Sequence, residues 1–231
     1  MKIKESLFRS LAALVLAAAM LGASVCAYAD EGGSRYEDVQ PDDWFYDAVE
    51  HCAKYNSPLC LIEDPVHSRI DTHHYGKSSL FYPDRTFTFD PAVRDICMLH
   101  HVLSKMSDGY ITPSNADKSD YIFYKGTYAT AFGLYDTFVG EPTDSKTPIP
   151  RAAFISLLYS AVPEELFPEE PPEITIPDVD TDTDLGRMIA AFYAAGVLCG
   201  TDEDGTFDGD RAITRAEEAV IFSRVLQKLG F

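Results

Sequence analysis

A two-helix pattern that recurs along the chain is the feature that most constrains its fold. The pattern is clearest in the C-terminal quarter, where Asp178 opens a stretch of apolar residues at helical spacing. Gly196 ends this predicted helix, because glycine adopts the left-handed cap conformation at little cost. A turn at Gly205 follows. Thr214 then begins a second helix, with Glu217 three residues later as in a capping box.

The same pattern recurs twice earlier, less completely. In the first third, Asp38 and Trp44 open a helix, and a second helix containing Arg94 follows after a long interval. In the middle, a helix starts near Tyr121 and a second one opens at Arg151. Three helix–loop–helix units of similar length can bury their apolar faces against one another, so we predict an all-α fold.

The pattern also divides the chain. We predict a first unit at residues 36–106 with an insertion at about 57–82, a second at 119–162, and a third at 174–230. Residues 163–173 combine four prolines with five glutamates, and we expect this linker to be extended and solvated.

The motifs resemble those of S-layer homology repeats. The resemblance rests on the Asp-Val openings, the Trp with an aromatic neighbour, the Gly-ended helix, the DGTF turn and the ITRAEEA stretch. The third unit matches over nearly its whole length, and the first two are diverged. The resemblance implies three repeats packed with pseudo-threefold symmetry into a three-pronged spindle, with ligands in the grooves between prongs. It also implies non-covalent attachment to cell-wall polysaccharide, often a pyruvylated one.

The resemblance further implies a set of glycan contacts. An arginine at a helix start would combine a fixed cation with free backbone N–H groups, which suits a sugar-borne carboxylate. An aromatic ring would stack on a sugar, and a glycine turn would let the backbone approach. The implied ligand-binding residues are Arg94, Arg151, Arg215, Trp44, Tyr121, Gly205, Thr206 and Glu217. Other interpretations stay open: Trp44 as a core residue, Glu217 as a helix cap, and Arg215 as an ion-pair partner.

Residues 1–29 have the pattern of an export signal. A basic start precedes an apolar run that is too short to span a bilayer, and Ala27-Tyr28-Ala29 supplies small residues for cleavage. A lipid anchor at Cys26 is disfavoured because the branched Val25 precedes it. We therefore expect secretion to the cell wall or cell surface, with no membrane insertion after cleavage. Four cysteines remain, Cys52, Cys60, Cys97 and Cys199, and the sequence does not decide their pairing.

Charge restricts the partners. The chain has 19 basic and 37 acidic residues, a formal charge of −18, which argues against nucleic acid or an anionic lipid surface. The same charge disfavours an acidic polymer unless positive grooves are well shielded. No nucleophile elbow, metalloprotease motif or phosphate loop is present, so we expect no catalysis and no cofactor.

All six histidines lie in the first unit with three cysteines, but their spacing matches no compact metal site. The acidic runs lack the ligand spacing of an EF-hand. We therefore predict no metal site and expect an exported cell-envelope protein that binds cell-wall polysaccharide. The alternatives are a diverged scaffold that binds other envelope proteins, or a His/Cys metal-binding insertion in the first unit.

Overall fold

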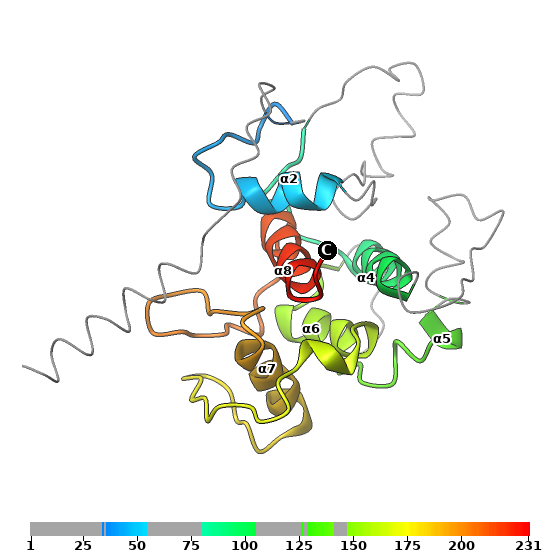
Figure 1. Ribbon diagram of the computed structural model, residues 1–231, viewed down its shortest axis with the longest axis vertical. Helices are drawn as coiled ribbons and strands as arrows, with labels where there is room; N and C mark the ends of the chain where they lie inside the picture. The colour runs from blue at the N-terminus through cyan, green and yellow to red at the C-terminus, as the bar shows by residue number, and fades with distance from the viewer. Residues whose placement is uncertain (1–33, 35, 55–79, 105–125, 127–128, 141–146) are drawn as a thin grey trace, which may run out of the picture. The chain divides into compact units, whose positions relative to one another are not determined.

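The described part of the chain is helical. The computed structural model describes residues 34, 36–54, 80–104, 126, 129–140 and 147–231, which all belong to one compact unit (Figure 1). These residues form no β-sheet, only isolated bridges, and the predicted all-α class is confirmed. The export signal, Tyr121, Cys60 and most of the predicted insertion lie outside the described residues. The elements are α2 (Tyr46–Lys54), α4 (Phe89–Ser104), α5 (Ala129–Ala131), α6 (Arg151–Ala161), η2 (Glu164–Leu166), α7 (Asp184–Ala194) and α8 (Arg215–Lys228).

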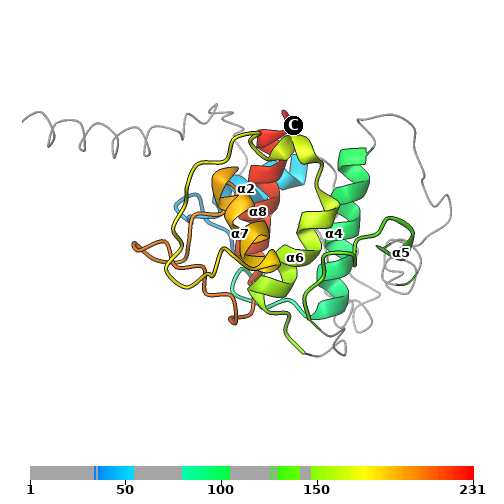
Figure 2. The same ribbon diagram turned by 90° about the horizontal axis from the view of Figure 1, so that it is seen from below.

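Helices α4, α6 and α8 occupy the middle of the fold. Figure 1 looks along them and Figure 2 shows them from the side, with α2 and α7 flanking. Helix α2 packs against α8, α4 against α6, and α6 against α7. The rings of Phe154 and Phe222, both fully buried, stack at 6.0 Å between α6 and α8. No helix among the described residues is long and apolar enough to cross a membrane.

A ring of backbone hydrogen bonds joins the three segments that lead into these helices. The N–H of Phe87 donates to the carbonyl of Ile213 at 3.1 Å, and the N–H of Ile213 donates to Ile149 at 3.3 Å. The N–H of Ile149 closes the ring on the carbonyl of Phe87 at 2.9 Å. Because each of the three residues lies two positions before a helix start, Phe89, Arg151 and Arg215 occupy equivalent positions.

This register corrects one sequence-based assignment. Arg94 was expected at a helix start, but α4 begins at Phe89 and Arg94 lies in its second turn. Its side chain is buried and its Nε donates to Asp95 Oδ1 at 2.9 Å. The counterpart of the two arginines at the starts of α6 and α8 is therefore Phe89, an apolar residue.

The opening aspartate of the third unit fixes the turn that precedes α8. One carboxylate oxygen of Asp178 accepts the N–H of Phe207 at 2.8 Å, and the other accepts the N–H of Asp208 at 2.7 Å. The residues are about 30 positions apart, so this contact ties the two ends of the unit together.

Asp38 makes the same pair of contacts in the first unit. Its oxygens accept the N–H groups of Phe81 at 2.6 Å and Tyr82 at 2.7 Å. The second residue of each pair has a positive φ of 56°, both at Tyr82 and at Asp208. The aspartates of the two Asp-Val motifs thus have the same structural role: each accepts hydrogen bonds from a turn that contains a residue in the left-handed backbone conformation.

The Pro/Glu segment at 163–173 is only partly solvated. Its glutamates are exposed, but Leu166 is buried in η2. The ring of Phe167 stacks on Tyr159 at 5.2 Å and meets Phe192 edge-on at 5.3 Å. The prediction of an extended, solvated linker is therefore wrong at these two apolar residues, which hold the segment against α6 and α7.

Candidate functional site

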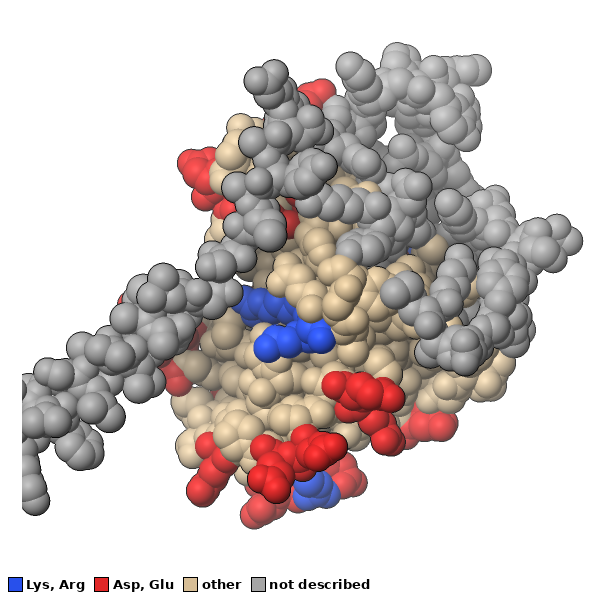
Figure 3. Space-filling model, viewed as in Figure 1, with Lys and Arg blue, Asp and Glu red and all other residues tan. Residues whose placement is uncertain are grey.

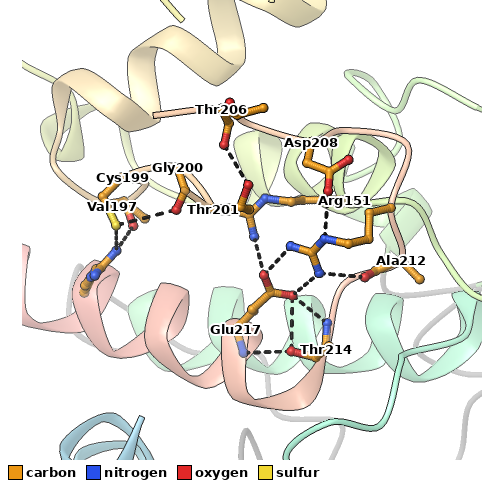
Figure 4. A network of polar contacts seen from close by, with 12 residues as sticks. Arg151, Val197, Cys199, Gly200, Thr201, Thr206, Asp208, Ala212, Thr214 and Glu217 are labelled. Carbon is orange, nitrogen blue, oxygen red and sulfur yellow. Dashed lines mark hydrogen bonds and ion pairs between the residues drawn. The ribbon is translucent and has the colours of Figure 1, made fainter. Parts of the chain in front are cut away.

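Arg151 lies at the junction between α6 and the turn before α8. The residue is 4% exposed, and its guanidinium carbon lies 5.2 Å from the centre of the Phe207 ring. Its Nη1 contacts Glu217 Oε1 at 3.4 Å (Figure 4). Burial lowers the pKa of Arg151, while the Glu217 charge opposes that shift. Arg151 is thus a buried cation that faces a carboxylate of its own chain.

Glu217 is the centre of this polar network. Arg211 donates to its two oxygens at 2.6 and 3.0 Å, and the N–H of Thr214 donates at 3.0 Å. Burial alone would raise the pKa of the Glu217 carboxyl, but the hydrogen bonds from Arg211 and Thr214 and the Arg151 charge lower it below its usual value. The predicted capping box of Thr214 and Glu217 is present. The carboxylate is therefore ionised and fully engaged.

Arg215 begins α8 and differs from Arg151 in exposure. It is half-buried, and its Nε donates to the carbonyl of Phe81 at 2.6 Å. Its guanidinium lies over the rings of Phe81, at 4.8 Å, and Phe87, at 5.8 Å. These contacts hold the cation where α8 meets residues 80–85.

The first N–H groups of α6 and α8 are not free for an anion, contrary to the sequence-based expectation. The first two N–H groups of each helix are bonded to backbone carbonyls of a turn from another part of the chain. These four N–H groups are therefore already used within the chain. The bonds run from Arg151 to Arg211, Ala152 to Gly209, Arg215 to Arg85 and Ala216 to Pro83, at 2.8, 2.9, 3.0 and 3.0 Å.

The glycine turn before α8 is closed by its own side chains. The N–H of Thr206 donates to Asp202 at 2.9 Å, and the hydroxyl of Tyr193 donates to the carbonyl of Gly205 at 3.2 Å. Hydrogen bonds from Thr206 lower the pKa of the Asp202 carboxyl. Gly205 has a φ of +81°, and a Cβ there would meet no atom within 4 Å, so its Cα faces open space.

The family comparison agrees with this geometry. The family model of the S-layer homology domain matches residues 175–218. The chain carries an S-layer homology domain. The match begins three residues before Asp178, continues through α7 and ends in the first turn of α8, so it includes Arg215 and Glu217. No curated protein matches the chain.

An S-layer homology domain indicates association with the cell surface or cell wall, and such domains are binding modules rather than catalytic ones. The residues that the resemblance implied are distributed unevenly around the S-layer homology domain. Arg215, Gly205, Thr206 and Glu217 lie within the matched residues, whereas Trp44, Arg94 and Arg151 lie outside them.

Trp44 is at the surface. The residue is 68% exposed, with its ring edge-on to Phe45 at 5.4 Å, so the interpretation of Trp44 as a core residue is wrong. Phe45 is buried and stacks on Phe81 at 6.2 Å, which places Trp44 on the outer side of the cluster that supports Arg215.

The position of Phe89 was missed by sequence reasoning. Its ring stacks on Tyr135 at 6.5 Å and packs against Phe138 at 5.5 Å. This junction therefore holds an aromatic cluster where the other two hold an arginine. The available signal was the apolar residue two positions before each helix start, at 87, 149 and 213.

The structure also shows the surroundings of three cysteines and of the side chains that could bind a metal ion. Among the described residues, Cys52 and Cys97 are buried and Cys199 is exposed, and all three are free thiols. The same part of the chain contains no group of three His, Cys, Asp or Glu side chains positioned to hold a metal ion.

Proposed function

We propose that this chain is an exported cell-envelope protein that attaches non-covalently to a secondary cell-wall polysaccharide, pyruvylated polymers included. The observation that carries the proposal is the S-layer homology match at residues 175–218. It ends in the first turn of α8, at the one helix start in the described residues that combines an arginine with partial exposure.

Two features support a three-repeat spindle as the frame for this site. The ring of hydrogen bonds through Phe87, Ile149 and Ile213 relates the three helix starts by an approximate threefold arrangement. The paired contacts of Asp38 and Asp178 relate the first unit to the third. The export signal at residues 1–29 accounts for delivery to the envelope.

Arg215 is the best suited of the three proposed arginines. A carboxylate bound by a guanidinium gains a charge-assisted hydrogen bond, and it needs access to the cation. Arg94 and Arg151 are each 4% exposed, and Arg151 already contacts Glu217. Arg215 is half-buried and is held by the Phe81 carbonyl through Nε.

The overall charge makes a localised cation important. Acidic side chains gather at the edge of the face shown in Figure 3, and only a few basic side chains lie on it. With a formal charge of −18, long-range attraction of an anionic polymer is excluded, so contact must be short-ranged. Trp44 supplies an exposed ring for stacking on a sugar, and Gly205 and Thr206 supply a turn whose backbone a polymer can approach. Glu217 acts through the arginines that it orients, and Tyr121 remains a candidate for stacking.

A sedimentation assay tests the proposal. The protein is mixed with peptidoglycan sacculi before and after hydrofluoric acid removes the attached polysaccharide. We expect binding to untreated sacculi only, and we expect Arg215→Ala to reduce it. Arg187→Ala is the matched control, because Arg187 is an exposed arginine on α7 that pairs with Asp184. Binding to neither preparation would overturn the proposal and favour a scaffold that binds envelope proteins.

A further inference from the structure

Three large apolar side chains of the first unit are exposed, two of them in the turn at residues 80–85. Trp44 is 68% exposed, Tyr82 46% and Leu80 39%. They lie next to the buried rings of Phe45 and Phe81, which stack at 6.2 Å. Soluble proteins scatter single exposed apolar residues, but a group supported by a buried aromatic cluster indicates a binding surface.

Tyr82 also has an unfavourable backbone. Its φ of 56° lies in the left-handed region, where a bulky side chain is strained. The N–H bond to Asp38 holds it there. Its counterpart in the third unit, Asp208, has the same φ, but aspartate tolerates that conformation well. A tyrosine with this φ lowers the stability of the fold. Its presence therefore suggests a role other than stabilising the turn.

The Arg215 cation lies beside the same turn. The carbonyl of Phe81 accepts from Arg215 Nε at 2.6 Å, and the carbonyl of Arg85 accepts from the Arg215 N–H at 3.0 Å. Tyr82 stands between these two acceptors in the chain, and its carbonyl accepts from the N–H of Arg85 at 3.1 Å. The exposed Tyr82 side chain thus belongs to the residue that directly follows the acceptor of the Arg215 guanidinium.

The corresponding turn of the third unit has the opposite character. Asp208 replaces the tyrosine, and its carboxylate accepts from Arg211 Nε at 3.1 Å. The adjoining arginine there is Arg151, which is 4% exposed and faces Glu217. A negatively charged sugar at that turn would meet a carboxylate rather than a ring. Among the described turns, only residues 80–85 combine an exposed ring with a neighbouring arginine that is half-buried rather than buried.

We propose that Tyr82 is a specificity-determining residue for an acidic sugar, whose apolar ring face lies on the Tyr82 side chain while its carboxylate contacts Arg215. This inference rests on the proposed function, which it narrows to one turn and one ligand class. Tyr82 binds and positions the sugar, and the strained backbone keeps its ring exposed next to the cation.

The test uses two substitutions that separate binding from folding. Tyr82→Asn removes the ring and relieves the left-handed strain, so we expect its urea midpoint to be equal to or above that of the wild type. We expect its affinity for untreated sacculi to fall by about tenfold, from the lost ring contact. Tyr82→Phe keeps the ring and should bind like the wild type. Phe132→Asn, which removes another exposed ring, is the matched control.

The outcomes are distinct. Reduced binding with unchanged or raised stability supports the inference, because a purely structural role would lower both together. Wild-type affinity in Tyr82→Asn overturns the role of Tyr82 and leaves the proposed function intact. A loss of equal size in Phe132→Asn also overturns it, since the effect is then not local to the turn. If the wild-type protein ignores sacculi, both the inference and the proposed function fail.

Discussion

Asp95 gives the sharpest prediction about stability. Its side chain is fully buried in α4, and its Oδ2 has no hydrogen-bond partner among the described residues. Burial raises the pKa of its carboxyl from 3.8 to about 6, although the charge and hydrogen bond of Arg94 and the charge of Arg215 act in the other direction. The folded protein therefore binds a proton at Asp95 more tightly than the unfolded chain does.

The sign and size of the effect follow from linkage. Because the folded pKa is the higher one, unfolding becomes less favourable as the pH falls through about 6. The full pKa difference corresponds to about 3 kcal/mol, at roughly 1.4 kcal/mol per pKa unit. That limit is reached below the unfolded pKa. Between pH 7 and pH 5 we expect the free energy of unfolding to rise by about 1 kcal/mol.

Urea denaturation at pH 7, 6 and 5 measures this effect. The comparison is between the wild type, Asp95→Asn and the exposed control Glu169→Gln. A neutral residue cannot titrate, so the Asp95→Asn protein should lose the added pH dependence while Glu169→Gln keeps it. General charge repulsion in this acidic protein affects all three variants alike. An Asp95→Asn protein with the wild-type slope would refute the reasoning.

Two further predictions concern the third unit. Asp178→Ala removes the acceptor of two backbone N–H groups in the turn before α8 and should cost about 2 kcal/mol, measured by urea unfolding against the exposed control Asp204→Ala. An equal effect of both would contradict this account. Gly186→Ala would place its Cβ 2.0 Å from the carbonyl oxygen of Asp180, so we expect a loss of 2 kcal/mol or more, on the order of overpacking. Gly205→Ala, which meets no atom but has a φ of +81°, should lose only about 1 kcal/mol. A reversed order in thermal unfolding would show that the clash is relieved by small shifts.

Local sequence signals predicted the helix ends well. The capping box of Thr214 and Glu217 and the glycine at 196, with a φ of 68°, are found where the pattern placed them. Both depend on residues within one helical turn, so the sequence contains the whole of the information. The all-helical class follows from the same short-range periodicity.

The register between units was harder to predict. The pattern suggested a helix start at Arg94, but α4 begins at Phe89, before Pro91, a residue tolerated in a first turn. What fixes the true start is the hydrogen bond from Ile149 to Phe87, which joins residues 62 positions apart. No local sequence preference encodes such a contact. Aligning the three units by the spacing of their arginines therefore gave Arg94 in place of Phe89.

The sequence predicted which residues form the candidate site but not how exposed each of them is. The sequence identified Arg151 and Arg215 alike, because their neighbours Ile149-Pro150 and Ile213-Thr214 are so similar. Their difference in exposure comes from what packs over them, since Arg151 lies beneath Phe207 and against Glu217. Such burial is a property of tertiary packing and is absent from the motif.

The ring through Phe87, Ile149 and Ile213 has a consequence for how the chain can be divided. Each member both donates to one neighbour and accepts from the other, so no member completes its hydrogen bonds within its own unit. A peptide limited to the matched residues 175–218 would leave both polar groups of Ile213, a fully buried residue, without partners. The matched residues therefore do not form an autonomous folding unit. Their conformation at Ile213 depends on the segments that contain Phe87 and Ile149, both of which lie outside the match.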